Sequence, residues 1–334
     1  MQSGDRPRVL VTDQMIHRKA IAVLEQVAEV RVVPQHSAEP VLAEAARDVE
    51  GILARSSKIT ANVLAASPSL KIVARHGVGV DSVDLAEATR RGVLVTTTPE
   101  ANAVTVAEYV FALLLGYSRK VIAANATVRE GRWDRSSLVG VELYQKTMGI
   151  IGLGNIGSRV AQRAKGFGME VVGHDPYLSA ERARELGVSL TTLEDLLARA
   201  DIVTLHVRAT GETRAMIGER EFRAMKPSAI FVNTSRGEVV DERALIQALR
   251  ERCIAGACLD TFRQEPLEVP SPLRELDNVL LSPHVGGQSE EAMIRMGTEA
   301  AGYIVAVLRG EIPGAVYNKE ALNTAEWIQR KRQS

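Results

Sequence analysis

The sequence has few cysteines, no excess of either charge and no long uninterrupted hydrophobic run. Only two cysteines occur among the 334 residues, and the spacing of Cys253 and Cys258 fits neither a metal site nor a disulfide framework. Cys258 lies in the apolar run Ile254–Leu259, so we expect a buried thiol there. This use of cysteine suits a reducing cytosol, and the sequence therefore predicts a cytoplasmic protein without a metal site.

The charges of the chain balance, with 41 Lys and Arg residues against 41 Asp and Glu residues. A chain without excess positive charge gives no electrostatic reason to bind nucleic acid or an anionic membrane. The first residues are polar and lack the apolar core of a signal peptide. The most hydrophobic helical stretch, Val104–Tyr117, is interrupted by Glu108 and is too short to cross a bilayer. We therefore expect neither a nucleic-acid partner nor a membrane partner.

The length of the chain predicts two domains, because 334 residues exceed the usual size of a single hydrophobic core. Residues 8–103 alternate between strand and helix patterns, which predicts a parallel sheet with helices on both faces. A long helix is expected over about residues 104–129. Six strands of a second α/β series follow, near residues 148–151, 170–173, 202–207, 229–233, 255–259 and 279–282.

A last helix is expected over about residues 290–309, followed by a polar tail. We place this helix on the first domain, because the six-stranded sheet of the second is already complete. The predicted domains are residues 1–103 with 288–334, and residues 104–287. The predicted fold class is α/β, with two doubly wound parallel sheets: an inner dinucleotide-binding Rossmann domain inserted in an outer flavodoxin-like domain. We expect a ligand-binding cleft between the two domains.

Glycines in G-x-G-x-x-G spacing, Gly152, Gly154 and Gly157, lie between a short apolar strand and a helical pattern over Asn155–Phe167. In a dinucleotide-binding unit the first glycine permits a tight turn and the second lets the backbone approach a pyrophosphate. The third lets the helix pack closely on the strand. The alternative is a glycine-rich turn in an ordinary α/β unit, but the strand before and the helix after favour the dinucleotide.

The pyrophosphate is expected at the helix N-terminus, next to Asn155 and Ile156, where backbone N–H groups and the helix dipole favour negative charge. Asp175 lies 23 residues after Gly152 at the end of the next predicted strand, placed to accept a hydrogen bond from a ribose 2′-OH. Its carboxylate would repel a 2′-phosphate. The sequence therefore predicts NAD as the cofactor in preference to NADP.

Three polar clusters follow the last three predicted strands: N-T-S-R-G at 233–237, D-T-F-R-Q-E-P at 260–266 and S-P-H-V-G-G at 282–287. Open α/β sheets bind ligands at the carboxyl ends of their strands. Arg236, Glu265 and His284 are therefore expected to converge on one edge. Taken singly, each has an ordinary alternative: a surface arginine, a turn glutamate before proline and a loop histidine.

Together with Arg55-Ser56 and Gly77–Asp81, these motifs resemble the D-isomer-specific 2-hydroxyacid dehydrogenases over essentially the whole chain. That family includes 3-phosphoglycerate dehydrogenase and the glyoxylate and hydroxypyruvate reductases. The resemblance implies hydride transfer between nicotinamide C4 and substrate C2. Arg236 would hold the substrate carboxylate, His284 would carry the proton and Glu265 would orient the imidazole.

The resemblance also implies contacts that the residues alone do not predict. The backbone N–H groups of Val78 and Gly79 would bind the substrate carboxylate, and Asp260 would hold the nicotinamide carboxamide. The other implied cofactor contacts are Val207, Thr234, Ser235, Arg236, His284 and Gly286. A homodimer through residues 104–138 is implied as well. We expect no regulatory domain after residue 320, and Arg208 stands where relatives often have proline.

Arg55 and Arg75 end predicted strands of the outer domain and suggest a substrate with a second anionic group. D-3-phosphoglycerate is therefore the first candidate substrate, and a surface or ion-pair role for both arginines is the alternative. Glyoxylate, hydroxypyruvate and other D-2-hydroxy acids remain open, as does the direction of the reaction. A corepressor-like protein that senses NAD without turning over a substrate is the alternative from another class.

Overall fold

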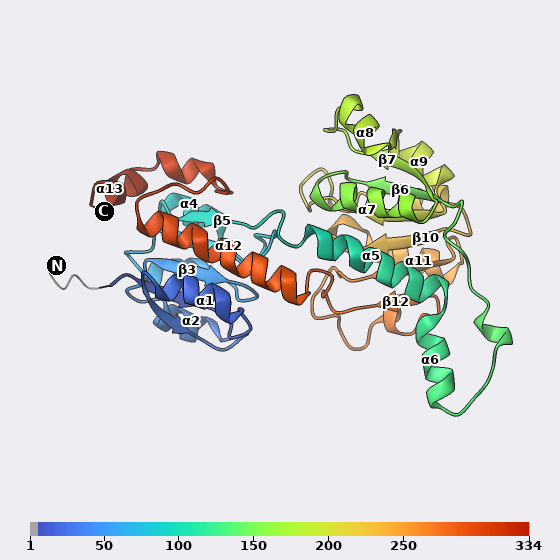
Figure 1. Ribbon diagram of the computed structural model, residues 1–334, viewed down its shortest axis with the longest axis horizontal. Coiled ribbons are helices and arrows are strands. Elements are labelled where there is room, and N and C mark those ends of the chain that lie inside the picture. Colours follow the sequence, from blue (N-terminus) through green and yellow to red (C-terminus); the bar gives the residue numbers. More distant parts are fainter. Residues whose placement is uncertain (1–5, 334) are drawn as a thin grey trace. The chain divides into compact units, whose positions relative to one another are not determined.

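The computed structural model describes residues 6–333, which form two compact units (Figure 1). Unit 1 ends at Asn102 and resumes at Gln288, and unit 2 is Ala103–Gly287. The sequence placed these boundaries at 103/104 and 287/288. The polar residues before Arg6, considered above as a signal peptide, lie outside the described residues. Within residues 6–333, no helix has both the length and the apolar character needed to cross a membrane.

Unit 1 contains a five-stranded parallel sheet with the strand order β2-β1-β3-β4-β5. Its strands are β1 Arg8–Val11, β2 Glu29–Val32, β3 Gly51–Ala54, β4 Ile72–Arg75 and β5 Leu94–Thr96. The chain first adds a strand on one side of β1 and then builds outward on the other side. This is the strand order of flavodoxin-like sheets, and the predicted fold of the outer domain is confirmed.

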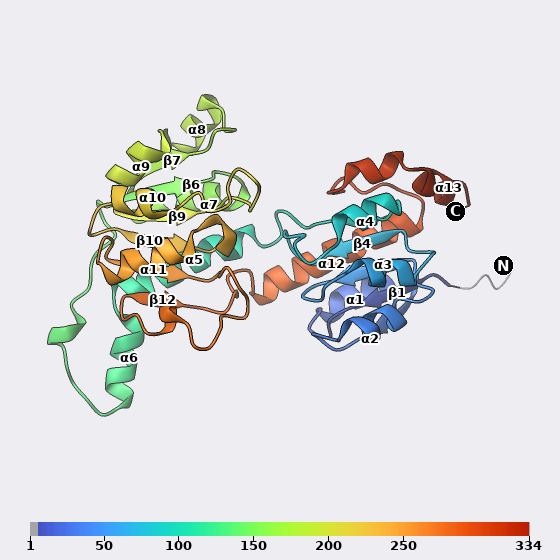
Figure 2. The ribbon, with the colours of Figure 1, turned by 180° about the vertical axis from the view of Figure 1, so that it is seen from behind.

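Helices cover both faces of this sheet (Figures 1 and 2). They are α1 Arg18–Glu25, α2 Glu39–Ala45, α3 Ala61–Ala66, α4 Leu85–Arg90 and α12 Glu290–Leu308. Helix α12 packs on α1, β3 and β4 and buries Ala300 and Ile304, so its predicted return to the first domain is confirmed. The expected polar tail is itself helical, with a 3₁₀ turn at Lys319–Asn323 and α13 at Ala325–Gln333.

Unit 2 contains a seven-stranded parallel sheet with the order β12-β11-β10-β9-β6-β7-β8. Its strands are β6 Thr147–Ile151, β7 Glu170–His174, β8 Ser189–Leu190, β9 Ile202–Leu205, β10 Ile230–Asn233, β11 Gly256–Leu259 and β12 Val279–Leu281. The six predicted strands are present, and the direction of winding reverses between β6 and β9. The sequence did not predict β8, because its two residues are exposed and carry no hydrophobic pattern.

The helices of unit 2 flank this sheet. They are α5 Ala103–Ser118, α6 Val121–Arg129, α7 Asn155–Gly166, α8 Ala180–Leu186, α9 Leu193–Arg199, α10 Glu219–Ala224 and α11 Glu242–Arg250. Short 3₁₀ turns lie at Ser136–Leu138, Gly237–Val239 and Pro272–Arg274. Cys258 on β11 is fully buried, as predicted, and burial raises the pKa of its thiol.

The prediction of one helix over residues 104–129 was wrong, because the chain breaks between α5 and α6. Lys120 adopts the left-handed conformation, with φ 51°, and its ammonium group donates to Ser137 O at 2.8 Å. The chain returns to the end of α5 at Val141, whose N–H donates to Ser118 O at 2.9 Å. The carbonyl of Ser118 accepts from Val141 N instead of from a residue in a further helical turn. Helix α5 therefore ends at Ser118.

The core of unit 2 includes an aromatic pair that should be sensitive to truncation. Phe231 on β10 is fully buried and packs edge-to-face on Phe222, with ring centroids 5.3 Å apart. We expect Phe231→Ala to lower the free energy of unfolding by about 3–5 kcal/mol, because it leaves a cavity in a close-packed core. Urea denaturation followed by circular dichroism measures this change. Tyr177→Ala, at a side chain 85% exposed, is the control, and equal losses in both variants would contradict the prediction.

Candidate active site

The glycine turn after β6 has the geometry that a dinucleotide requires. Gly152 has φ +88°, and a Cβ at this position would lie 2.7 Å from His206 O and 2.8 Å from Val207 Cγ1. A Cβ at Gly157 would lie 2.0 Å from Gly152 O, so the start of α7 packs directly on the turn. At Gly154, by contrast, a Cβ would meet no atom within 4 Å. The turn is therefore closed on its protein side and open at its second glycine.

Asp175 follows β7 and is fixed by this turn. Its Oδ2 accepts from Leu153 N at 2.8 Å, and its Oδ1 accepts from Tyr177 N at 3.0 Å. Helix α7 begins at Asn155 with Gly154 as its N-cap and with no side-chain cap. An uncapped helix N-terminus beside an open glycine suits an anion, and a fixed carboxylate at the next strand end suits a ribose. These residues fit a dinucleotide.

Glu265 and His284 meet at the carboxyl edge of the same sheet. The Nδ1–H of His284 donates to Glu265 Oε2 at 2.7 Å, and Glu265 Oε1 accepts from Phe262 N at 3.1 Å. An ionised carboxylate can only accept, so Nδ1 carries the hydrogen in this pair. Nε2 of His284 has no hydrogen-bond partner within residues 6–333. The side chains of His284 and Glu265 are 45% and 37% exposed, which leaves Nε2 available for proton exchange.

The pair shifts the pKa values of both residues in opposite directions. The hydrogen bond that His284 donates to Glu265 outweighs burial and, together with the charge of Glu265, holds the pKa of His284 above the ordinary value of 6.5. Burial disfavours the ionised form of Glu265, but the hydrogen bond and charge of His284, with help from Phe262 N and Arg236, keep its pKa below 4.5. The arrangement therefore favours an imidazolium next to a carboxylate.

Arg236 lies next to this pair, so the structure brings together the three residues expected at this edge. Its Nη1 donates to Ser235 O at 2.7 Å, and its charge acts on both Glu265 and His284. A Cβ at Gly237 would lie 1.9 Å from the carbonyl carbon of Phe262. The turn that carries Arg236 and the loop that carries Glu265 therefore pack backbone against backbone, which only glycine permits.

Asp260 clamps the segment that carries His284. This nearly fully buried carboxylate accepts from Ser282 Oγ at 2.6 Å, from Val285 N at 2.9 Å and from Gly286 N at 2.8 Å. His284 itself has φ +53°, a conformation that costs energy for a residue with a Cβ. Each carboxylate oxygen can accept two hydrogen bonds. Oδ1 of Asp260 accepts two and Oδ2 accepts one, so one acceptor position remains at Oδ2. Its predicted contact to the nicotinamide carboxamide remains a prediction.

Thr234 and Ser235 were also predicted to contact the cofactor, and their hydroxyl groups differ in hydrogen bonding. Thr234 Oγ1 is buried and has no hydrogen-bond partner among the described residues. Ser235 Oγ donates to Asn233 Oδ1 at 2.9 Å, so its hydroxyl already serves the turn. Val207 packs against the core of unit 2 beside the glycine turn, and Arg208 is exposed. Within residues 6–333, no group of three His, Cys, Asp or Glu side chains is placed to hold a metal ion.

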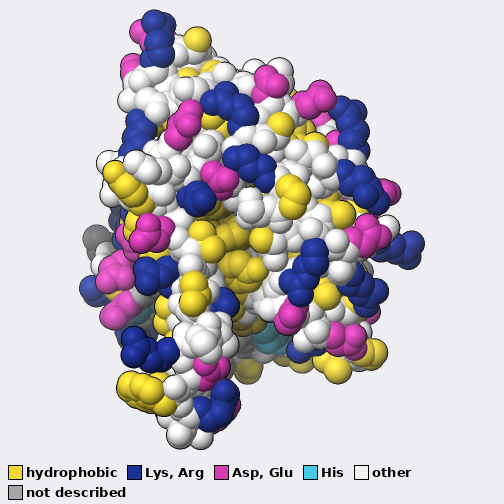
Figure 3. Space-filling model, turned by 90° about the vertical axis from the view of Figure 1, so that its right-hand side faces the viewer, with side chains coloured by type: hydrophobic (Ala, Val, Ile, Leu, Met, Phe, Trp, Pro, Cys, Tyr) yellow, Lys and Arg dark blue, Asp and Glu magenta, His cyan; other side chains and the backbone are white. Residues whose placement is uncertain are grey.

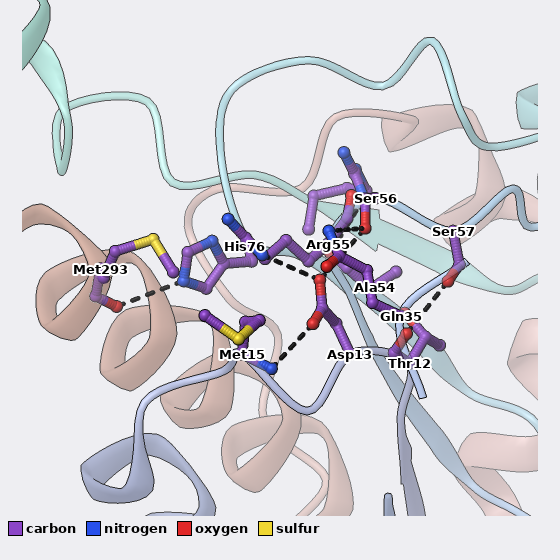
Figure 4. A network of polar contacts seen from close by, with 11 residues as sticks. Thr12, Asp13, Met15, Gln35, Ala54, Arg55, Ser56, Ser57, His76 and Met293 are labelled. Carbon is purple, nitrogen blue, oxygen red and sulfur yellow. Dashed lines mark hydrogen bonds and ion pairs between the residues drawn. The ribbon is translucent and has the colours of Figure 1, made fainter. Parts of the chain in front are cut away.

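In unit 1, Arg55 belongs to a polar network around the buried carboxylate of Asp13 (Figure 4). Its Nη1 donates to Asp13 Oδ2 at 2.9 Å, and Ser56 Oγ donates to the same oxygen at 3.1 Å. Asp13 is fully buried and also accepts from Met15 N at 2.8 Å. Arg55 therefore forms an ion pair with Asp13, which was the alternative to a substrate-binding role for this arginine. Sequence reasoning missed Asp13, although a carboxylate directly after a buried strand is a signal that could have found it.

Arg75 is used within unit 1 as well. Its Nε donates to Gly79 O at 3.0 Å, and its Nη1 donates to Ala54 O at 2.9 Å and to Arg55 O. It thereby ties the end of β3 to the loop that contains Val78 and Gly79, the predicted carboxylate-binding loop. His76 at the start of this loop lies close to Met293 O, at 3.2 Å from Nε2. Burial, with the charge of Arg55, lowers the pKa of His76 to about 4, so this histidine is neutral at pH 7.

Comparison with known proteins identifies relatives over nearly the whole chain. Residues 111–286 match the model of the NAD binding domain of D-isomer specific 2-hydroxyacid dehydrogenases. The chain is 44% identical over 313 residues to D-3-phosphoglycerate dehydrogenase of Methanocaldococcus jannaschii, covering 93% of this chain but 59% of that protein. It is 42% identical over 324 residues to glyoxylate reductase of Korarchaeum cryptofilum, covering 95% of this chain and 97% of that protein.

A solved structure shares the fold over both units. The TT0316 protein from Thermus thermophilus is 36% identical and superposes with a TM-score of 0.85, covering 93% of this chain and 99% of that one. The chain therefore has relatives of its own length, while it spans 59% of the Methanocaldococcus enzyme.

The shifted pKa values of the histidine–glutamate pair predict how its contribution to stability depends on pH. The part due to the raised pKa of His284 is complete below pH 6.5 and is lost as the pH rises through the folded value. The part due to the lowered pKa of Glu265 is complete above pH 4.5 and is lost as the pH falls through the folded value. The pair should therefore stabilise the protein most between these limits.

Glu265→Gln should lower the pKa of His284, measured by NMR titration of its ring proton. Glu268→Gln, at an exposed glutamate nearby, is the control, and an unchanged His284 titration in Glu265→Gln would contradict the assignment.

Proposed function

Because the chain belongs to the D-isomer specific 2-hydroxyacid dehydrogenase family, we propose that it is an NAD-dependent oxidoreductase that interconverts a D-2-hydroxy acid and its 2-keto acid. The hydrogen bond of 2.7 Å between His284 Nδ1 and Glu265 Oε2 carries the proposal. It leaves Nε2 for the substrate, at the carboxyl edge of the sheet that also bears the glycine turn. A histidine with one nitrogen fixed by a carboxylate is the arrangement that general acid–base catalysis requires.

The residues have separate tasks in the oxidation of the hydroxy acid. NAD, when bound, supplies the hydride acceptor for C2. Arg236 holds the substrate carboxylate and polarises the C2 oxygen, work that suits a permanently charged, forked donor. His284 Nε2 takes the proton of the C2 hydroxyl, and Glu265 stabilises the imidazolium that forms. In the reduction of the keto acid, the imidazolium returns this proton to the C2 oxygen.

The preference for NAD is supported by the carboxylate at the end of β7. Asp175 is held by Leu153 N and Tyr177 N, so it cannot turn away from a ligand at the glycine turn without losing both hydrogen bonds. A fixed carboxylate accepts from a ribose 2′-OH and repels a 2′-phosphate. The cofactor is NAD on this argument, in agreement with the family's NAD binding domain.

For the substrate, we propose D-3-phosphoglycerate. The relative in Methanocaldococcus jannaschii bears the name D-3-phosphoglycerate dehydrogenase, and Arg55 follows the end of β3, with one of its donors on Asp13. The remaining donors of a guanidinium fork suit a phosphate. Val78 and Gly79 are proposed to bind the substrate carboxylate, with Arg75 holding their loop in place.

Reduction of glyoxylate or hydroxypyruvate is the second candidate. The donors of Arg75 reach three backbone carbonyl oxygens, a structural use that requires no phosphate. The relative of similar length in Korarchaeum cryptofilum bears the name glyoxylate reductase. The presence or absence of a phosphate on the preferred acid distinguishes the two candidates.

A panel of 2-hydroxy and 2-keto acids, with and without phosphate, tests the function by NADH absorbance. We expect turnover, with the highest kcat/KM for a phosphorylated acid, and a loss of about 10²–10⁴-fold in His284→Ala, because that variant lacks the proton carrier. Activity only with unphosphorylated acids would establish the second candidate. An inert protein that still binds NADH would favour an NAD-sensing binding protein, and full turnover by His284→Ala would remove the proposed proton carrier.

We also propose a homodimer through the α6 arm, defined as residues 119–146. Helix α6 and the chain that follows it extend away from the sheet of unit 2 (Figures 1 and 2), and the arm returns to the core of this unit at Leu143. Figure 3 shows hydrophobic side chains in the middle of the face that it draws. The arm itself exposes large hydrophobic side chains. In the arm these are Val121, Ile122, Val128, Trp133, Val139, Val141 and Tyr144, each more than half exposed. A cluster of this kind marks an interaction surface, and a second copy of the chain would cover it.

Sedimentation tests the dimer. We expect the protein to sediment at twice its mass of 36.2 kDa, and Ile122→Asp with Val128→Asp to produce the monomer, because two buried charges without partners would oppose association. Val269→Asp, at a valine 80% exposed outside the arm, is the control and should leave the dimer intact. A monomer at all protein concentrations would contradict the proposal.

A further inference from the structure

The side chain of Asn233 makes its hydrogen bonds to the turn that follows it. Asn233 is the last residue of β10 and is 1% exposed. Its Oδ1 accepts from Ser235 N at 3.0 Å and from Ser235 Oγ at 2.9 Å, and its Nδ2 donates to Arg236 O at 3.0 Å. One planar amide thereby makes three hydrogen bonds within the next three residues.

These hydrogen bonds act on the two residues that determine where the guanidinium of Arg236 lies. Arg236 Nη1 donates to the carbonyl of Ser235, and Asn233 holds both the N–H and the hydroxyl of Ser235. Asn233 also holds the carbonyl of Arg236 itself. Both the start of the arginine side chain and the carbonyl on which its end rests are therefore fixed by one buried group.

No other common side chain of this size could replace the amide. Aspartate has the same shape and retains an acceptor for Ser235, but its carboxylate has no hydrogen to donate to Arg236 O. Alanine removes all three hydrogen bonds and leaves the turn to find other partners. The main chain of Asn233 is fixed independently, since its carbonyl accepts from Asp260 N at 2.9 Å.

We propose that Asn233 is a positioning residue for Arg236, which sets where the guanidinium meets the substrate carboxylate. The inference rests on the proposed function, because it assumes that Arg236 binds the substrate. The side chain of Asn233 bonds to Ser235 and Arg236 and not to His284, so it would act through the turn. A displacement of about 1 Å at a residue that positions the substrate can cost 10²-fold in rate.

Kinetics of Asn233→Asp and Asn233→Ala test the inference. We expect kcat/KM for the best acid of the panel to fall by about 10–10²-fold, mainly through a higher KM. The loss should be smaller in Asn233→Asp, which keeps the acceptor for Ser235. NADH affinity, measured by fluorescence titration, should stay within about twofold. The pH profile should keep its shape, because Glu265 and His284 still form their pair. If the alanine variant does not fold, the aspartate variant still gives the result.

Asn278→Asp is the matched control. Asn278 is 4% exposed, and its Nδ2 donates to Leu249 O at 3.2 Å and Ala255 O at 3.3 Å, away from the three site residues. We expect its thermal midpoint to fall as in Asn233→Asp, with kcat/KM unchanged. If Asn233→Asp also retained kcat/KM, its role would be structural and the inference would be wrong. A wild-type protein that turns over no acid would instead overturn the proposed function, and the inference with it.

Discussion

The hydrogen bond between His284 and Glu265 is the interaction on which the proposed chemistry depends, and neighbouring groups of unit 2 hold its two ends. Phe262 N fixes the far oxygen of Glu265, and Asp260 binds the chain on both sides of His284. His284 has a backbone conformation that costs energy, with φ +53°. Such a conformation persists only where its surroundings determine it several times over, and the three hydrogen bonds that one buried carboxylate accepts do so.

Buried polar side chains at or just beyond the ends of strands hold the neighbouring loops or turns at three places. Asp13 after β1, Asn233 at the end of β10 and Asp260 after β11 are each nearly or fully buried. Each accepts from groups of the neighbouring loops or turns, and Asn233 donates as well. Loops at the carboxyl edge of a parallel sheet cannot pair their backbone in the sheet, so buried side chains satisfy it instead. The loops that carry the candidate site residues are therefore held by hydrogen bonds to buried side chains.

Much of this could be predicted from sequence, because the signals are local. Hydrophobic runs gave the strands, the glycine spacing located the turn after β6, and parallel topology predicted that Arg236, Glu265 and His284 share an edge. The break at Lys120 could not be predicted, since it depends on a contact between Ser118 O and Val141 N, distant in sequence. The partners of Asp260 and Arg75 were missed for the same reason: a motif identifies a side chain but not which backbone groups surround it.

The break at Lys120 separates α5, which is largely buried, from α6, which is largely exposed. Helix α5 buries Val110 and Leu114 in the core, so its residues are constrained by packing against the sheet. Within α6 only Thr127 is buried, so its sequence is nearly free of that constraint. Had the helix run on unbroken, a change in the direction of one half would have moved the other. Substitutions at the exposed positions of α6 should therefore change the surface of the arm without disturbing the packing of α5 on the rest of unit 2.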